Sequence, residues 1–130
     1  MTTSKAQLLT ARILAGLSIS FLLFDSIIKL LELPTAITAT LELGYPASAV
    51  FAIGLIELAC IALYAIPRTS LLGAVLLNGY LGGAIASQVR VGNPLLSHVL
   101  FPTYVAAMLW GSLYLRDVRL RILLPIGAPL

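Results

Sequence analysis

The sequence predicts an all-α integral membrane protein, an antiparallel four-helix bundle with both termini in the cytoplasm. Of its 130 residues, 60% are apolar and 10% are charged, whereas soluble domains carry about 25% charged residues. A chain with so little charge cannot cover a water-facing surface, which excludes a soluble enzyme, a disordered tail and a nucleic-acid-binding module. Apolar segments of about 20 residues, enough to cross a bilayer, recur along the chain. We therefore interpret residues 1–130 as a single transmembrane domain.

The four predicted spans follow one another with short connections. We place them at residues 11–31, 47–66, 71–89 and 94–115. They are expected to be helical because the bilayer interior offers backbone groups no water. The partly apolar loop 32–45 predicts a short helix that lies on the membrane surface or caps the bundle. Residues 67–70 are so few that the second and third spans form a tight hairpin, and Pro102 predicts a kink in the fourth.

Basic residues predict the orientation of the spans. The side that holds the N-terminus, the loop between the second and third spans and the C-terminus carries Lys5, Arg12, Arg68, Arg116, Arg119 and Arg121. The other side carries only Lys29 and Arg90. Because basic residues concentrate on the cytoplasmic side, we expect both termini in the cytoplasm, and a bacterial inner membrane as the location.

The few polar residues of the spans gather in the outer half of the bundle. The candidate ligand-binding residues are Asp25, Lys29, Glu57, Gln88, Arg90 and His98. An ionisable side chain at the centre of a span costs about 2.5–3.5 kcal/mol on insertion scales, so these groups should turn inward and meet. Two interpretations remain open. One is a structural network in which Lys29 neutralises Asp25 or Glu57, and the other is a polar pocket, open to the outer surface, that binds a ligand or relays protons.

Glu57 is the most informative of these positions. Buried without a partner it would take up a proton, whereas paired with Lys29 it would stay ionised. A carboxyl group that switches between these states suits proton-coupled chemistry such as quinone reduction. The alternative is that Glu57 has a structural role and joins two helices by a hydrogen bond. We expect no metal or haem site, because the chain has one histidine and one cysteine, and His98 is expected at the pocket mouth.

A stripe of small residues marks the third span. Gly79, Gly83 and Ser87 recur every four residues, a pattern that lets another helix approach closely. We expect this stripe to pack helices, within the chain or between copies of it.

Several short motifs resemble the DoxX-like family of small four-helix membrane proteins. They are Lys29, the segment Leu43-Gly44-Tyr45-Pro46, Gly54-x-x-Glu57-Leu58, and Tyr80-Leu81-Gly82-Gly83-Ala84 followed by Arg90. The resemblance implies four helices with cytoplasmic termini, and Lys29, Glu57 and Arg90 as recurring polar positions. Relatives include a subunit of a thiosulfate:quinone oxidoreductase and members of oxidative-stress complexes. Gln88 stands where relatives often have histidine, which argues against a histidine-dependent role there.

These observations lead to one functional hypothesis and two alternatives. We expect an outward-facing pocket for a small lipophilic molecule, with quinone as the candidate, in a membrane redox system. Lys29 would orient an anionic or carbonyl oxygen, Glu57 would handle a proton, and Arg90 with His98 would line the opening. The alternatives are a non-catalytic scaffold or assembly factor for a larger membrane complex and a small oligomeric transporter. Expected partners are the lipid bilayer and another membrane subunit or a second copy.

Overall fold

The computed structural model describes residues 3–126, and all its regular secondary structure over that range is helical. The elements in chain order are α1 (Lys5–Leu30), α2 (Pro34–Glu42), α3 (Ala49–Ala65), α4 (Ser70–Arg90), the π-helical turn η1 (Leu95–Val99), α5 (Phe101–Arg116) and α6 (Val118–Leu123). None of the described residues forms a strand.

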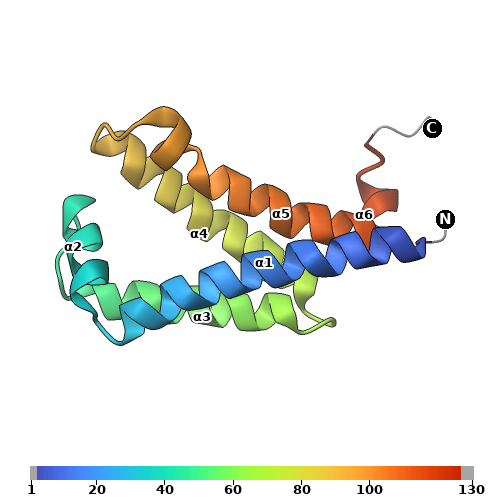
Figure 1. Ribbon diagram of the computed structural model, residues 1–130, viewed down its shortest axis with the longest axis horizontal. Helices are drawn as coiled ribbons and strands as arrows, with labels where there is room; N and C mark the ends of the chain where they lie inside the picture. The colour runs from blue at the N-terminus through green and yellow to red at the C-terminus, as the bar shows by residue number, and fades with distance from the viewer. Residues whose placement is uncertain (1–2, 127–130) are drawn as a thin grey trace.

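The long helices α1, α3, α4 and α5 lie alongside one another (Figure 1). α1 packs against α3 and α5, and α4 packs against the same two helices. Each long helix therefore touches two neighbours, which leaves the centre of the group to buried side chains such as Leu22, Tyr64, Leu77 and Leu109. Many apolar side chains on the outside are exposed, including Phe24 and Leu96, as expected where lipid replaces water.

The helices match the predicted spans closely. α1, α4 and the segment Leu95–Arg116 are each long and apolar enough to cross a membrane. The span predicted at 47–66 coincides with α3, an apolar helix of 17 residues. At about 1.5 Å per residue, α3 covers about 26 Å, slightly less than a typical hydrocarbon core.

The predicted short helix in the first loop is confirmed as α2. Pro34 stands in its first turn, where the missing N–H costs nothing. Gly44, with φ of +89°, follows the helix and turns the chain toward α3. α2 contacts α1 and α3 and lies at the end of the molecule opposite both termini (Figure 1).

The fourth predicted span is broken near the expected kink. The Leu100 N–H donates to the Leu95 carbonyl at 2.9 Å, a wider turn than in an α-helix. α5 then begins at Phe101 with Pro102 in its first turn. Because proline has no N–H to continue the preceding helix, the chain restarts the helix there.

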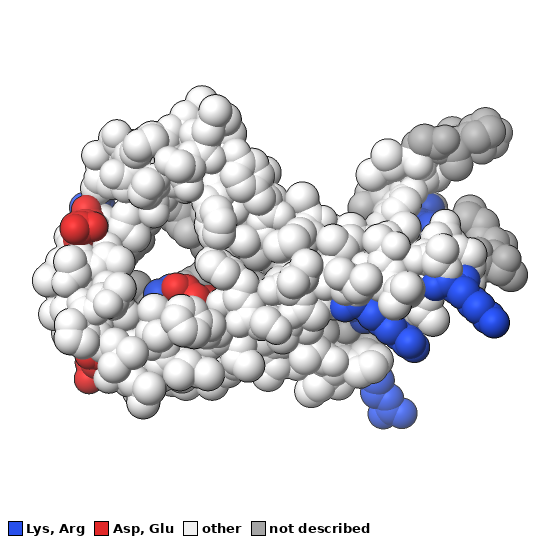
Figure 2. Space-filling model, in the orientation of Figure 1, with Lys and Arg blue, Asp and Glu red and all other residues white. Residues whose placement is uncertain are grey.

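Apart from a charged group in the hollow beside α2, the charged residues visible in Figure 2 lie at the two ends of the molecule. In this view Lys and Arg gather at the end that carries both termini, and most of the visible acidic atoms lie at the end that carries α2. The short helix α6, which the sequence did not predict, belongs to the basic end.

Gly54 allows α1 and α3 to approach closely. The Ser26 hydroxyl donates to the Gly54 carbonyl at 2.9 Å. A Cβ atom added at Gly54 would lie 2.8 Å from Cβ of Lys29 and 3.2 Å from the Leu30 nitrogen and the Ser26 carbonyl oxygen. Backbone atoms cannot yield as a side chain does, so this contact requires glycine.

We therefore expect Gly54→Ala to destabilise the protein by about 1–3 kcal/mol, because the added methyl group overpacks the contact between α1 and α3. The measurement is the free energy of unfolding in mixed detergent and SDS micelles. Gly79→Ala is the matched control, since a Cβ there meets no atom within 4 Å, and it should leave stability unchanged or raise it by up to about 1 kcal/mol. Equal losses in both variants would contradict the role given to Gly54.

Candidate functional site

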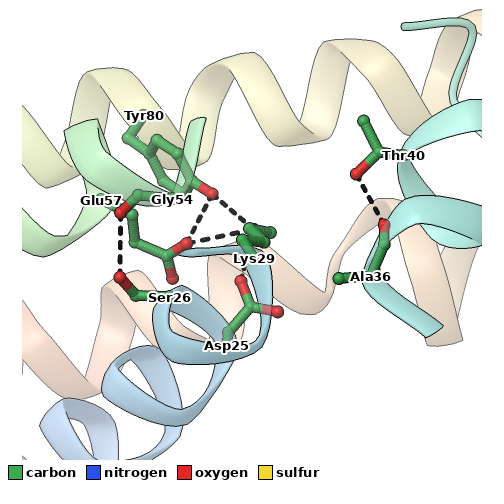
Figure 3. A network of polar contacts seen from close by, with 8 residues as sticks. All are labelled: Asp25, Ser26, Lys29, Ala36, Thr40, Gly54, Glu57 and Tyr80. Carbon is green, nitrogen blue, oxygen red and sulfur yellow. Dashed lines mark hydrogen bonds and ion pairs between the residues drawn. The ribbon is translucent and has the colours of Figure 1, made fainter. Parts of the chain in front are cut away.

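Lys29 is the centre of a polar network that joins three helices (Figure 3). Its Nζ atom donates to Oδ2 of Asp25 at 2.5 Å, to Oε2 of Glu57 at 3.0 Å and to the Tyr80 hydroxyl oxygen at 2.8 Å. The Tyr80 hydroxyl in turn donates to Oε2 of Glu57 at 2.8 Å. We call Asp25, Lys29, Glu57 and Tyr80 the Lys29 cluster.

Helical geometry brings these four side chains together. Asp25 and Lys29 stand one turn apart on α1, with the acid nearer the N-terminus, which is the favourable order for an ion pair. Glu57 reaches them from α3, and Tyr80 from α4. The Gly54 contact places α3 close enough to α1 for Lys29 to reach Glu57.

The cluster runs from a fully buried group to a partly exposed one. The exposed fraction of the side chain is 0% for Glu57, 16% for Lys29 and 31% for Asp25. Two carboxyl groups share one ammonium group, so the cluster carries one excess negative charge when both are ionised. The Tyr80 hydroxyl partly compensates by donating to Glu57.

Glu57 has one oxygen that the network does not use. Oε2 accepts from both Lys29 and Tyr80, whereas Oε1 is buried and has no hydrogen-bond partner among the described residues. Leaving a buried charged acceptor without a donor is costly. A proton bound at Oε1 would remove the buried negative charge, at the cost of the ion pair between Oε2 and Lys29.

Two cavities flank the Lys29 cluster on the side of α2. The first, of about 360 Å³, lies between α1, α2, α4 and α5, and the second, of about 300 Å³, lies between α2, α3 and α4. Lys29 and Tyr80 stand in the walls of both, and so do Thr40 of α2 and Leu43 directly after it. Most of the exposed wall is apolar, and Figure 2 shows charged atoms at the floor of the hollow beside α2.

The remaining predicted residues lie apart from the cluster. Gln88 stands in the wall of the first cavity and accepts a hydrogen bond from the Asn93 amide. Arg90 is exposed, and its guanidinium lies against the turn at Gly44. His98 is also exposed, and its Nδ1 atom is 2.8 Å from the Ser97 hydroxyl. The structure therefore brings together Asp25, Lys29 and Glu57, and it does not bring Arg90 or His98 to them.

Tyr80 is the member of the Lys29 cluster that reasoning from charge missed. It appears in the sequence as an aromatic residue of an apolar span, yet its hydroxyl bridges Lys29 and Glu57. A second tyrosine acts similarly at the cavity edge, where the Tyr45 hydroxyl lies 2.7 Å from the Ser87 hydroxyl. Tyr80 and Ser87 are seven residues apart on α4, a spacing that places both on one helical face and could have indicated them.

The predicted small-residue stripe is open within the described chain. A Cβ added at Gly79 or Gly83 would meet no atom within 4 Å. Both glycines instead line the second cavity together with Ser87. Packing of another helix against this stripe remains a prediction.

The comparisons with known proteins agree with this architecture. A sequence profile of the DoxX-like family matches residues 13–112. This range contains the whole Lys29 cluster and both sides of the two cavities. No curated protein and no solved structure matched the chain.

We expect Lys29→Met to destabilise the protein by about 3 kcal/mol or more, because it leaves the buried Glu57 without its cationic partner. The double variant Lys29→Met with Glu57→Leu should recover most of that loss, since it removes the stranded carboxyl group as well. The free energy of unfolding in mixed micelles measures both. A double variant as unstable as the single one would show that Glu57 is not the group that needs Lys29.

Proposed function

This protein belongs to the DoxX-like family, and we propose that it binds a small lipophilic molecule at the Lys29 cluster as a component of a membrane redox system. Our candidate ligand is a quinone. The observation that carries the proposal is the pair of hydrogen-bonding groups, Lys29 and Tyr80, in the shared wall of two largely apolar cavities. Apolar pockets with a few convergent polar groups are typical of small-molecule sites.

The chemistry of the cluster favours a ligand that offers an acceptor oxygen. The three hydrogens of the Lys29 ammonium are directed to Asp25, Glu57 and Tyr80. Of these three acceptors, only Tyr80 is uncharged, so its bond to Lys29 is the least costly to exchange. We infer that a carbonyl oxygen of the ligand replaces the Tyr80 oxygen as the acceptor, while Asp25 and Glu57 keep theirs.

Glu57 is our candidate for proton handling. It is fully buried and lines neither cavity, so it would reach a ligand only through Lys29 or Tyr80. The Tyr80 hydroxyl donates to Glu57, and Tyr80 stands in the wall of both cavities. In this proposal Glu57 first takes up a proton at Oε2. Tyr80 then turns its own hydroxyl proton to the ligand oxygen and accepts the proton of Glu57, while a redox partner in the membrane supplies the electrons.

We further propose that α1, α3, α4 and the segment Leu95–Arg116 all cross the bacterial inner membrane as an antiparallel four-helix bundle. The basic end, which carries both termini, would then face the cytoplasm. In this orientation α2 and the two cavities lie at the outer side of the membrane.

A scaffold or assembly role is the second candidate, and the open glycine stripe favours it. Gly79 and Gly83 leave space that another membrane helix could occupy. In that case the purified protein would carry a stoichiometric partner, and substitutions in the Lys29 cluster would not affect the assembly.

We expect the purified protein to bind a short-chain ubiquinone, and Lys29→Met to weaken binding by about tenfold or more, because the variant lacks the donor for the carbonyl oxygen. Titration followed by calorimetry measures the dissociation constant. The double variant Lys29→Met with Glu57→Leu should be more stable than the single one and show the same loss of affinity.

Lys5→Met is the matched control, because it removes the same group from an exposed position at the other end of the molecule. Its affinity should equal that of the wild type. No binding of quinone by the wild type, or equal binding by the wild type and the double variant, would refute the proposed site.

The orientation predicts which positions a membrane-impermeant thiol reagent reaches in intact cells. In a Cys60→Ser background, Glu42→Cys in α2 should react from outside, whereas Ser4→Cys should react only after the cells are opened. Both positions are exposed. The reverse pattern would overturn the orientation without bearing on the ligand.

A further inference from the structure

A third cavity, of about 350 Å³, lies at the basic end of the molecule. It forms where the turn between α3 and α4 meets the junction of α5 and α6. Its wall includes Ser70, Leu113, Arg116, Asp117 and Arg119. None of these residues belongs to the Lys29 cluster or its cavities, so the function proposed above does not account for the third cavity.

Arg116 is held in a defined position in this wall. Its Nε atom donates to the Ser112 hydroxyl at 3.2 Å, and that hydroxyl donates to the Ala11 carbonyl at 2.7 Å. The guanidinium carbon lies 5.3 Å from the centre of the Tyr64 ring, a cation–π contact. No acidic residue within residues 3–126 forms an ion pair with Arg116. The terminal guanidinium nitrogens are therefore available to a ligand.

The other groups of the wall leave an excess of positive charge. Arg119 pairs with Asp117 at 3.3 Å, and its side-chain hydrogen bonds lower the pKa of Asp117, so this carboxyl group stays ionised at neutral pH. Two arginines and one aspartate leave one net positive charge. The Ser70 hydroxyl donates to the Tyr64 and Ile66 carbonyls. Nε and one terminal nitrogen of Arg119 donate to Asp117. A ligand would therefore meet the terminal nitrogens of Arg116 and the remaining terminal nitrogen of Arg119.

We propose that this cavity binds a phosphate group, with Arg116 as the main donor and Arg119 as the second. A planar guanidinium matches the oxygens of a phosphate and forms paired hydrogen bonds with it. The cavity lies at the basic end of an apolar bundle, where lipid headgroups surround the protein. The phosphate can belong to an anionic phospholipid or be free in solution, and the two sources share this chemistry.

Binding to purified protein in a neutral detergent separates the sources. The probes are dioctanoyl phosphatidylglycerol, dioctanoyl phosphatidylcholine and inorganic phosphate, each titrated by calorimetry. Tight binding of phosphatidylglycerol alone identifies an anionic lipid, whereas equal binding of inorganic phosphate identifies the free ion. Binding of none of the three overturns the proposal.

Two substitutions that each remove one positive charge test whether the probe binds in this cavity. Arg116→Gln should weaken binding of the preferred probe by about tenfold or more, since it removes a charge-assisted pair of hydrogen bonds. Arg68→Gln removes the same charge from an exposed residue outside the cavity wall and should change the affinity by less than about twofold. Equal losses in both variants would mean that only the general charge of this end attracts the probe, which contradicts a built site.

A third variant tests whether weaker binding in Arg116→Gln could result from a damaged fold. Asp117→Asn keeps a side-chain oxygen for the Arg119 backbone N–H and removes the negative charge beside the proposed phosphate. Binding should become tighter by about threefold or more. Because damage to the fold does not tighten binding, a gain supports the site, and an unchanged or weaker affinity counts against it.

Discussion

The structure depends on one constraint, the need of an ammonium group inside an apolar bundle to find acceptors. Lys29 meets it with a carboxylate from its own helix, a carboxylate from α3 and a hydroxyl from α4. Each acceptor fixes the rotation of the helix that carries it, so the cluster sets the register of three helices at once. Gly54 follows from the same requirement, because Glu57 reaches Lys29 only if α1 and α3 lie close together. The apolar core fills the remaining space but would tolerate many other arrangements of the same helices.

The same cluster connects a buried acidic residue to two cavities. Glu57, its member from α3, is fully buried and lines neither cavity. On the side of α2 the cluster borders cavities whose walls are largely apolar. A group that links a buried acid to an accessible cavity can exchange protons with a ligand that the acid never touches, and Tyr80 is the side chain in that position. The cavity lined by Arg116 and Arg119 at the other end differs, since the Arg119 side chain is largely exposed, and a solvated charge costs little.

Much of this architecture could be predicted from the sequence, because a bilayer leaves few choices. The apolar segments fall on α1, α3, α4 and the segment Leu95–Arg116, and the pairing of Lys29 with Asp25 follows from helical spacing. The pairing of Lys29 with Glu57 follows from the free-energy cost of an unpaired charged side chain inside an apolar span. Tyr80 could not be recognised in this way, since its ring fits an apolar span and only its hydroxyl joins the network. The exposed position of His98 could not be predicted either, because the wide turn at Leu95–Val99 rotates this segment relative to α5. A π-helical turn has no sequence pattern from which it can be predicted.

The hydrogen bond between Tyr45 and Ser87 has a consequence for access to the two cavities. α2 is joined to α1 by a tight connection at one end, and at the other end this pair of hydroxyls holds the chain to α4. Thr40 and Leu43 of this same strap form part of both cavities beneath it. Loss of this hydrogen bond would loosen one of several contacts that hold the strap, beside those of α2 with α1 and α3, and because the strap borders both cavities, any movement of it changes the two together.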